Sequence, residues 1–271
     1  MPNITIKQLF TYYIKGLTPH ACESVFLKEG HGIPGDRAFA LMYDENLTDI
    51  GKAVVPWMKK NHFAVQNDWA GLAGLSCHYD VETALLTVKR NDVKLLSSPT
   101  NTEAGRNNIS KFFTGYLAGL TSSELARHPN HAPLRFVGDS NGSTRYPDRE
   151  PVHISLLSQG TLNALSDLVG QQVDVKRFRP NVVIDGVEPW EEFKWVGQEF
   201  MLGSAKIKIT APINRCLNIN VHPETGELDL PLLTTLKQHL GHAQTGVLAT
   251  VVSSGSAKIG ENLFNNNSET I

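Results

Sequence analysis

The sequence predicts a mainly β protein of the α+β type, barrel-like in architecture and with a few short helices. Short apolar runs of strand-like composition recur along the chain, and turn-forming pairs such as Asp185-Gly186 and Gly203-Ser204 separate several of them. Only a few stretches place apolar residues at helical spacing. Many short strands with few helices are typical of a barrel-like fold, whereas a parallel α/β fold alternates strands with helices.

The first half of the chain is expected to form strands followed by one helix. Strands are predicted at residues 4–10, 37–43, 85–88 and 93–96, the last two as a hairpin around a polar turn. Apolar residues between 109 and 117 recur at helical spacing, which predicts an amphipathic helix at about residues 102–118. Residues 127–150 show no apolar periodicity and are rich in turn-forming residues, which indicates a domain junction or an active-site loop.

The second half is expected to combine further strands with two short helices. Ser158 can cap the first helix, which Gly170 ends, and the second helix covers residues 231–240. Strands are predicted at 152–157, 182–184, 200–202 and 207–210, with a final hairpin formed by 247–252 and 257–259.

Composition excludes several classes of protein. The 271 residues include 25 Lys and Arg and 27 Asp and Glu, which gives a net charge of −2. The sequence has no basic stripe, so we expect no nucleic-acid partner. Lys7 and Lys15 interrupt the apolar residues at the start, and no run approaches ~18 apolar residues. We therefore expect no signal peptide, no membrane segment and a cytoplasmic protein. Three widely spaced cysteines exclude a disulfide framework and a zinc ribbon.

Cys216 is the first candidate for chemistry. It follows Arg215 directly and opens the run LNINV, which is predicted as a strand. The thiolate is the reactive and metal-binding form of cysteine, and a neighbouring guanidinium stabilises its negative charge. This context leaves an alternative open: Cys216 could be a small buried residue of the core. For a lone cysteine, that is the more frequent case.

Four isolated basic residues, Lys15, Arg37, Arg179 and Arg215, form the second candidate. Each stands in an apolar or turn context. Arginine binds phosphate groups and planar polar rings through paired hydrogen bonds, so four converging cations would suit an anionic heterocyclic cofactor. Spacing alone does not show that they converge, and local pairing, for instance of Arg37 with a nearby carboxylate, remains the alternative.

Two histidine pairs, His128 with His131 and His239 with His242, have a three-residue spacing. A zinc site needs a third ligand and a general base, and the sequence has no HExxH motif, so metal ligation by these pairs is not favoured. GxGxxG, GxxxxGK[ST] and GxSxG motifs are absent too. Their absence argues against a glycine-rich nucleotide loop and against an α/β-hydrolase.

Four motifs of the second half stand in the order of a known family: RFRPNVVIDG at 177–186, INRCLNINV at 213–221, HPETGELD at 222–229 and GHAQTGVLATVV at 241–252. This order resembles the MOSC (molybdenum cofactor sulfurase C-terminal) domain, as found in mitochondrial amidoxime-reducing component and its bacterial relatives. The segments IKQLFTYYIKGL and GIPGDRAFAL resemble the β-barrel domain that commonly precedes it. The resemblance implies an N-terminal β-barrel domain at residues 1–120 and a MOSC β-barrel domain at residues 121–271.

The resemblance also implies a molybdenum–molybdopterin cofactor and the reduction of N-hydroxylated compounds. Cys216 matches the family's molybdenum ligand, and a soft thiolate suits that metal. The family's cofactor-holding positions match Lys15, Arg37, Arg179, Asn181 and Arg215. Ser158, or its neighbours at the start of a helix, is expected to bind the cofactor's phosphate through backbone amides. His153 and His222 are hypothetical proton donors.

The sequence departs from the family pattern at two positions. Gly16 stands where the family has a serine that could hold the cofactor, and Asn214 stands where some relatives have serine. We expect neither a ferredoxin-like domain nor a membrane anchor, so the electrons are expected to come from a separate protein. An alternative hypothesis is a sulfur-carrier or cofactor-handling module in which Cys216 holds a persulfide. A degenerate barrel that only binds ligands is a third hypothesis.

Overall fold

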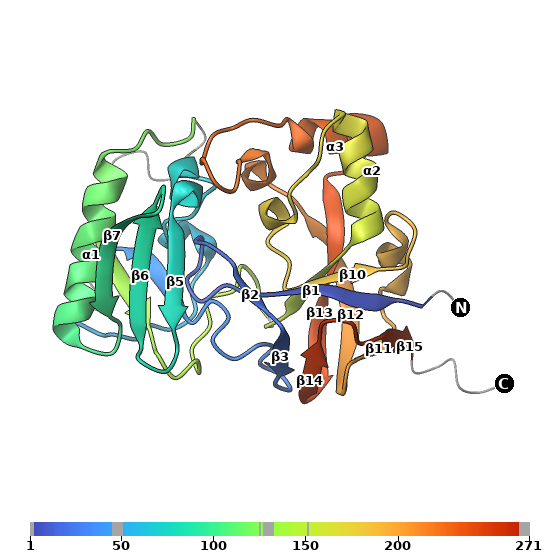
Figure 1. Ribbon diagram of the computed structural model, residues 1–271, viewed down its shortest axis with the longest axis horizontal. Coiled ribbons are helices and arrows are strands. Elements are labelled where there is room, and N and C mark those ends of the chain that lie inside the picture. The colour runs from blue at the N-terminus through green and yellow to red at the C-terminus, as the bar shows by residue number, and fades with distance from the viewer. Residues whose placement is uncertain (1–2, 45–50, 125, 127–132, 151, 266–271) are drawn as a thin grey trace.

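The computed structural model describes residues 3–44, 51–124, 126, 133–150 and 152–265, and two lobes lie side by side in it (Figure 1). One lobe contains a large curled sheet with helices α2 (Gln159–Val169) and α3 (Leu232–Leu240). The other contains two smaller sheets and helix α1 (Glu103–Ala118). Strands predominate in the described part of the chain, so the prediction of a mainly β, α+β fold is confirmed.

The large sheet has eight strands in the order β15-β11-β12-β13-β9-β10-β1-β2. Their bounds are β1 Thr5–Thr11, β2 His20–Cys22, β9 Ile154–Ser158, β10 Val182–Asp185, β11 Glu199–Leu202, β12 Ala205–Asn214, β13 Gln244–Ser253 and β15 Leu263–Asn265. All neighbours are antiparallel except β9 and β10, which are parallel. Parallel neighbours need a crossover, and α2 provides it between these two strands.

The sheet curls until its two ends nearly meet. Ile6 N–H donates to the carbonyl of Glu261 at 2.8 Å, and Leu263 N–H donates to the carbonyl of Ile4 at 2.9 Å. These bonds join the start of β1, near one end of the strand order, to the segment entering β15 at the other. Most of the barrel is therefore closed by main-chain hydrogen bonds, in agreement with the predicted barrel-like architecture.

The central strands of this sheet are buried on both faces. Successive residues of a strand point to opposite faces, so Leu156 and Val182 pack into the core inside the curl. Leu157 and Val183 pack instead against the apolar sides of α2 and α3. Gly170 ends α2 with φ 70°, a conformation that glycine adopts without strain.

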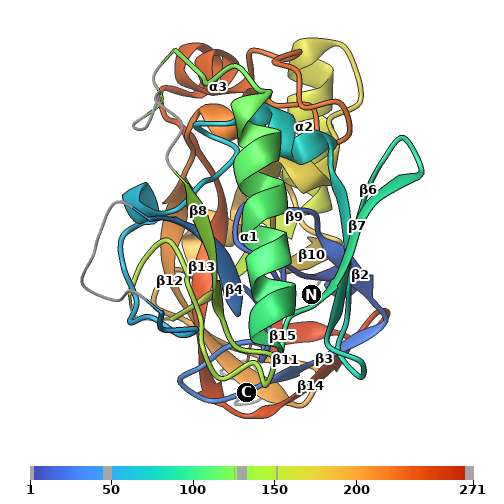
Figure 2. The same ribbon diagram turned by 90° about the vertical axis from the view of Figure 1, so that its left-hand side faces the viewer.

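The second lobe is built from the middle of the chain. Strands β5 (Ser76–Asp80), β6 (Leu85–Arg90) and β7 (Val93–Pro99) form an antiparallel sheet, and β4 (Phe39–Tyr43) pairs with β8 (Leu134–Gly138). Figure 2 shows α1 running along this lobe with β7 and β8 on either side. Thr102 caps the helix by accepting from Gly105 N–H, and its apolar side buries Ile109, Phe113 and Leu117.

Strand pairing crosses the domain boundary predicted at residue 120. β1 pairs with β10, and β3 (Ser24–Leu27) pairs with β14 (Gly255–Lys258), so N-terminal strands complete the C-terminal lobe. Conversely, β8 joins β4 in the other lobe. The division into residues 1–120 and 121–271 stays a prediction, but a cut there would separate paired strands.

Two local predictions are wrong. The run after Cys216 is a 3₁₀ helix, Leu217–Asn220, and not a strand, since its residues form short-range backbone bonds. Residues 247–252 and 257–259 do not form a hairpin with each other, because β13 pairs with β12 and β9 whereas β14 pairs with β3. Among the described residues, no helix combines the length and apolar character that crossing a bilayer requires.

Candidate functional site

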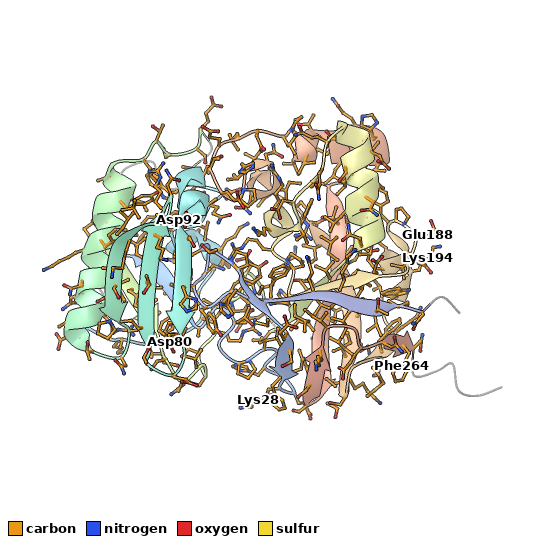
Figure 3. All side chains as sticks on the ribbon, viewed as in Figure 1. Lys28, Asp80, Asp92, Glu188, Lys194 and Phe264 are labelled. Atoms are coloured by element: carbon orange, nitrogen blue, oxygen red, sulfur yellow. The ribbon has the colours of Figure 1, made fainter. Side chains whose placement is uncertain are left out.

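A cavity of about 370 Å³ is lined by residues from both halves of the chain. Lys15, Gly16 and Lys60 come from the N-terminal half, and residues 177–181 and 213–219 contribute from the C-terminal half. Side chains of the two lobes meet in the region between their ribbons in Figure 3. The pairing of β1 with β10 brings these distant segments together, because it places residues 5–9 beside residues 182–185.

The structure brings six of the seven predicted site residues to this one cavity. They are Lys15, Arg37, Arg179, Asn181, Arg215 and Cys216. The four cations that sequence spacing could not place together therefore converge, and the predicted thiol converges with them.

Ser158 is the exception, and its expected role in binding is corrected. It is fully buried and does not line the cavity. Its hydroxyl oxygen accepts from Thr161 N–H at 3.1 Å as the cap of α2, and the hydroxyl donates to Glu192 at 3.0 Å. A capping side chain points at its own helix, so the residue that makes α2 begin here is not available to a ligand.

Tyr12 is fully buried and holds two of the cavity arginines. The guanidinium carbon of Arg179 lies 4.3 Å from the centre of its ring, and that of Arg37 lies 4.8 Å from it. The Tyr12 hydroxyl donates to the carbonyl of Pro180 at 3.1 Å. Both arginines have positive φ, 54° and 55°, a conformation that L residues rarely adopt and that clusters at functional sites.

Asp36 is a fully buried carboxylate among these cations. It forms ion pairs with Arg37 and with Arg145, the latter at 2.5 Å, and it accepts from Tyr12 N–H at 2.9 Å. Burial alone would raise its pKa, but the two guanidiniums and the hydrogen bonds hold the pKa below its ordinary value. Asp36 is therefore ionised and fixes two arginines at the cavity.

Arg179 and Arg215 have no carboxylate partner in the described part of the chain. Arg179 donates to the carbonyl of Leu17 at 2.6 Å, and its Nη2 is buried without a hydrogen-bond partner. Arg215 donates to Thr245 Oγ1 at 2.6 Å and to the carbonyl of Phe178 at 2.8 Å. Burial lowers the pKa of both side chains to about 10. Both remain charged at neutral pH, and an anion beside them would relieve the cost of burying that charge.

Lys15 is buried and forms an ion pair with Asp148, and its ammonium also donates to the carbonyl of Tyr146 at 3.0 Å. Burial lowers the pKa of Lys15 although Asp148 opposes this. The Asp148 side chain is exposed at the cavity, and the ammonium of Lys15 holds the pKa of this carboxyl well below its usual range. The pair is therefore ionised on both sides at neutral pH.

Cys216 lines the cavity as a half-buried thiol at the start of the short 3₁₀ helix. The adjacent Arg215 interacts with it electrostatically. The other cysteines, Cys22 and Cys77, do not line the cavity. Cys216 is thus the thiol that a ligand in the cavity can reach. It is not a core residue, although that is the more frequent role of a lone cysteine.

Basic residues outnumber acidic residues in the lining of the cavity. Eight of them contribute: Lys15, Arg37, Lys60, Arg145, Arg149, Arg177, Arg179 and Arg215. Among the described residues, Asp148 is the one carboxylate in the lining. In a chain whose net charge is −2, this concentration of positive charge favours an anionic ligand.

Sequence reasoning missed four of these cations, Lys60, Arg145, Arg149 and Arg177. Arg177 stands in the RFRPN motif itself and pairs with Asp229 of the HPETGELD motif through two bonds of 2.7 and 2.5 Å. The RFRPN motif is basic and the HPETGELD motif is acidic, and this difference in charge was the signal in the sequence that the two motifs lie together. Lys60, Arg145 and Arg149 stand in segments without a readable pattern, and only the fold brings them here.

The candidate histidines differ in whether they line the cavity. His153 lines the cavity and His222 does not. The Nδ1 of His222 accepts from the backbone of Glu224 and Thr225, each at 3.2 Å, which stabilises the polar turn. His239 and His242 do not line the cavity either, and His128 and His131 lie outside the described residues. Within the described part of the chain, no three His, Cys, Asp or Glu side chains form a metal-binding group.

Comparison with known proteins connects this cavity to a family. Residues 143–263 match the model of the MOSC domain. Over 146 residues the chain is 30% identical to mitochondrial amidoxime reducing component 2 of Rattus norvegicus, covering 48% of this chain and 40% of the relative. It is 34% identical over 133 residues to mitochondrial amidoxime-reducing component 1 of Mus musculus, covering 48% and 38%.

A third relative is the molybdenum cofactor sulfurase of Oryza sativa subsp. japonica, 33% identical over 81 residues, or 28% of this chain and 10% of the relative. The chain thus spans less than half the length of these curated relatives. The matched region contains most of the cavity residues, including Arg179, Arg215 and Cys216. Residues 143–263 of this chain are a MOSC domain.

Proposed function

We propose that the protein binds a molybdenum–molybdopterin cofactor and reduces N-hydroxylated compounds with electrons from a separate redox protein. The observation that carries the proposal is the convergence of Cys216 with Lys15, Arg37, Arg179 and Arg215 on one cavity. Similarity of this MOSC domain to amidoxime reducing components and to a molybdenum cofactor sulfurase supports a function in molybdenum cofactor chemistry.

The residues present fit such a cofactor. The Nη2 of Arg179 is a buried donor without a hydrogen-bond partner, and Arg179 and Arg215 are partly buried cations that form no ion pair with the described residues. A phosphate group would accept from Arg179 and compensate both charges. Cys216 supplies a soft thiolate, the ligand type that suits a high-valent metal already bound by sulfur.

The protein's own residues would act in three ways. Arg179, Arg215 and Lys15 bind the anionic part of the cofactor, and Cys216 is the metal ligand. Asn181 acts indirectly, because its side-chain oxygen already accepts from Ser155 N–H at 3.2 Å and its Nδ2 donates to Asp36 at 3.1 Å. When bound, the molybdenum centre supplies two-electron transfer.

The overall reaction takes up two electrons and two protons, the N–O bond breaks, and the oxygen leaves as water. A separate redox protein would supply the electrons. His153 lines the cavity and is the histidine positioned to hold a proton there, whereas His222 is turned to its own loop.

The alternative is a sulfur carrier in which Cys216 holds a persulfide, and the sulfurase similarity is the observation that favours it. Metal analysis and an activity assay separate the reductase from the sulfur carrier. Protein purified from molybdenum-replete cells should contain molybdenum and pterin at about one per chain, and Cys216→Ala should lose the molybdenum. Reduced benzyl viologen should drive the conversion of benzamidoxime to benzamidine by the native protein and not by Cys216→Ala.

Cys22→Ala is the matched control, since Cys22 is a half-buried thiol that does not line the cavity. It should keep both the metal and the activity. A metal-free protein that releases thiocyanate on treatment with cyanide would overturn the reductase proposal and support the sulfur carrier. A metal-loaded protein without activity towards any N-hydroxylated compound would leave only a cofactor-binding module.

A further inference from the structure

Half of the cations in the cavity already have a carboxylate partner in the protein. Lys15 pairs with Asp148, Arg37 and Arg145 pair with Asp36, and Arg177 pairs with Asp229. The other four are Arg179, Arg215, Lys60 and Arg149, which form no ion pair with the described part of the chain.

These four cations form two groups. Arg179 and Arg215 are anchored by main-chain carbonyls and are the cations that the proposed cofactor would compensate. Lys60 and Arg149 form no hydrogen bond through their side chains within the described residues; Lys60 is partly exposed and Arg149 is exposed. They therefore mark the solvent-facing part of the cavity.

From this division we infer that Lys60 and Arg149 bind a negatively charged group of the substrate. The inference rests on the proposed function and narrows its substrate class to N-hydroxylated compounds that carry a carboxylate or phosphate. An exposed lysine or arginine is ordinarily only a solvated charge. These two differ because they line the same cavity as Cys216, together with Arg179 and Arg215, which also form no ion pair with the described part of the chain.

Asp148 offsets only part of the charge of Lys60 and Arg149. It stands next to Arg149 in the chain and also interacts with Lys60, but its strongest attraction is to the buried ammonium of Lys15. The carboxylate is thus committed to the inner lysine. The guanidinium of Arg149 is left with the planar donor geometry that carboxylates and phosphates match in paired hydrogen bonds.

A pair of substrates that differ in one charge tests the inference. Benzamidoxime is neutral, whereas 4-carboxybenzamidoxime carries a carboxylate on the far side of the ring. With the cofactor-containing protein and reduced benzyl viologen, we expect KM for the carboxylated compound to be about five- to tenfold lower, since each exposed ion pair contributes up to about fivefold. Raising the salt from about 0.05 to 0.5 M should remove most of this difference.

The ratio of interest is KM for benzamidoxime divided by KM for 4-carboxybenzamidoxime. Arg149→Gln and Lys60→Gln should each reduce this ratio two- to fivefold, and the double variant should bring it close to one. The matched control is Lys194→Gln, because Lys194 is exposed and lies on the far side of the large lobe (Figure 3). It should keep the native ratio. Equal KM values in the native protein, or a ratio that neither cavity variant changes, would overturn the inference and leave the reductase proposal intact.

Two further outcomes keep the two proposals distinguishable. If neither compound is reduced, the proposed function fails, and calorimetric titration with 4-carboxybenzamidoxime still shows whether Arg149→Gln weakens binding of the anion. If the variants instead slow reduction only with a protein electron donor, Lys60 and Arg149 bind an acidic redox partner and not the substrate, which overturns the inference.

Discussion

The amide of Asn181 donates to the carboxylate of Asp36 at 3.1 Å and joins two residues that are 145 positions apart in the chain. The same carboxylate pairs with Arg37 and Arg145, and Asn181 also donates to the carbonyl of Phe10 at 3.2 Å. Asp36 thus connects β1, the GDR segment and the RFRPN motif in one buried polar network. Such networks stabilise a site only while all their members are present.

Asp36→Asn should destabilise the protein by about 3–5 kcal/mol, because it leaves two buried guanidiniums without their carboxylate. Since neighbouring cations lower the pKa of Asp36, the native protein keeps this contribution above the ordinary titration range of aspartate and loses it as the pH falls through the lowered pKa. Urea unfolding at pH 7 measures the loss.

The control for that substitution is Asp185→Asn, which removes an exposed pair with Lys7 at 3.0 Å. Exposed pairs contribute about 1 kcal/mol or less. Equal losses in the two variants would show that the network around Asp36 contributes no more than a surface ion pair.

Tyr12→Leu should lower cofactor content because it removes the ring on which Arg37 and Arg179 lie. Tyr12→Phe keeps the ring and loses one hydrogen bond, at a cost of about 1 kcal/mol, and should retain the cofactor. Pterin fluorescence of the denatured protein and bound molybdenum give the content.

Loss of packing alone would also destabilise the Tyr12→Leu protein, so a second buried tyrosine is needed for comparison. Tyr43 is equally buried, accepts from Trp69 Nε1 at 2.6 Å and does not line the cavity. Tyr43→Leu should lower the melting temperature to a similar extent while the remaining folded protein keeps its cofactor. If both leucine variants lose the cofactor alike, the ring of Tyr12 has no special role.

Glu192 is a buried carboxylate that forms no ion pair within the described part of the chain, and it accepts from the hydroxyls of Ser158 and Thr161 at 3.0 and 3.1 Å. Burial raises its pKa above the ordinary value. The folded state therefore binds this proton more tightly than the unfolded state, and the associated stability is present at low pH and lost as the pH rises through the raised pKa. Relative to Glu192→Gln, the native protein should therefore become less stable as the pH rises from the acidic range towards neutrality.

Chemical denaturation of both proteins at a series of pH values measures this difference. Glu199→Gln is a suitable control, since Glu199 lies near the surface beside Lys206. A constant difference between the native protein and Glu192→Gln across the range would contradict the prediction.

The sequence permitted the prediction of elements that depend on neighbouring residues. The β6–β7 hairpin and α1 follow from a polar turn and from helical spacing closed by the Thr102 cap. The predicted pairing of the final strands is wrong, because β14 pairs with β3, and no local signal connects residues 255–258 with residues 24–27. Spacing also placed the segment after Cys216 in a strand, although its backbone turns within four residues.

The site divides in the same way. Cys216 and its neighbour Arg215 could be found because they are adjacent, and family motifs identified Lys15, Arg37, Arg179 and Asn181. These residues converge because β1 lies beside β10, and the spacing of residues along the sequence does not reveal that pairing. Ser158 was assigned to the site because a helix begins there, yet a good capping residue satisfies its own helix first.

Gly16, which replaces the serine of the family pattern, has φ +81°, and a Cβ there would lie 3.1 Å from the carbonyl oxygen of Ala64 and 3.2 Å from Val65 Cα. Gly16→Ser should therefore destabilise the protein and displace the neighbouring Lys15. We expect a cost above the 1–2 kcal/mol of a positive φ alone, together with reduced cofactor content. Gly30→Ser isolates the backbone effect, since Gly30 has φ +66° and nothing within 4 Å of the added Cβ. Gains in stability and cofactor content for Gly16→Ser would instead mean that the loop relaxes to accept the family's residue.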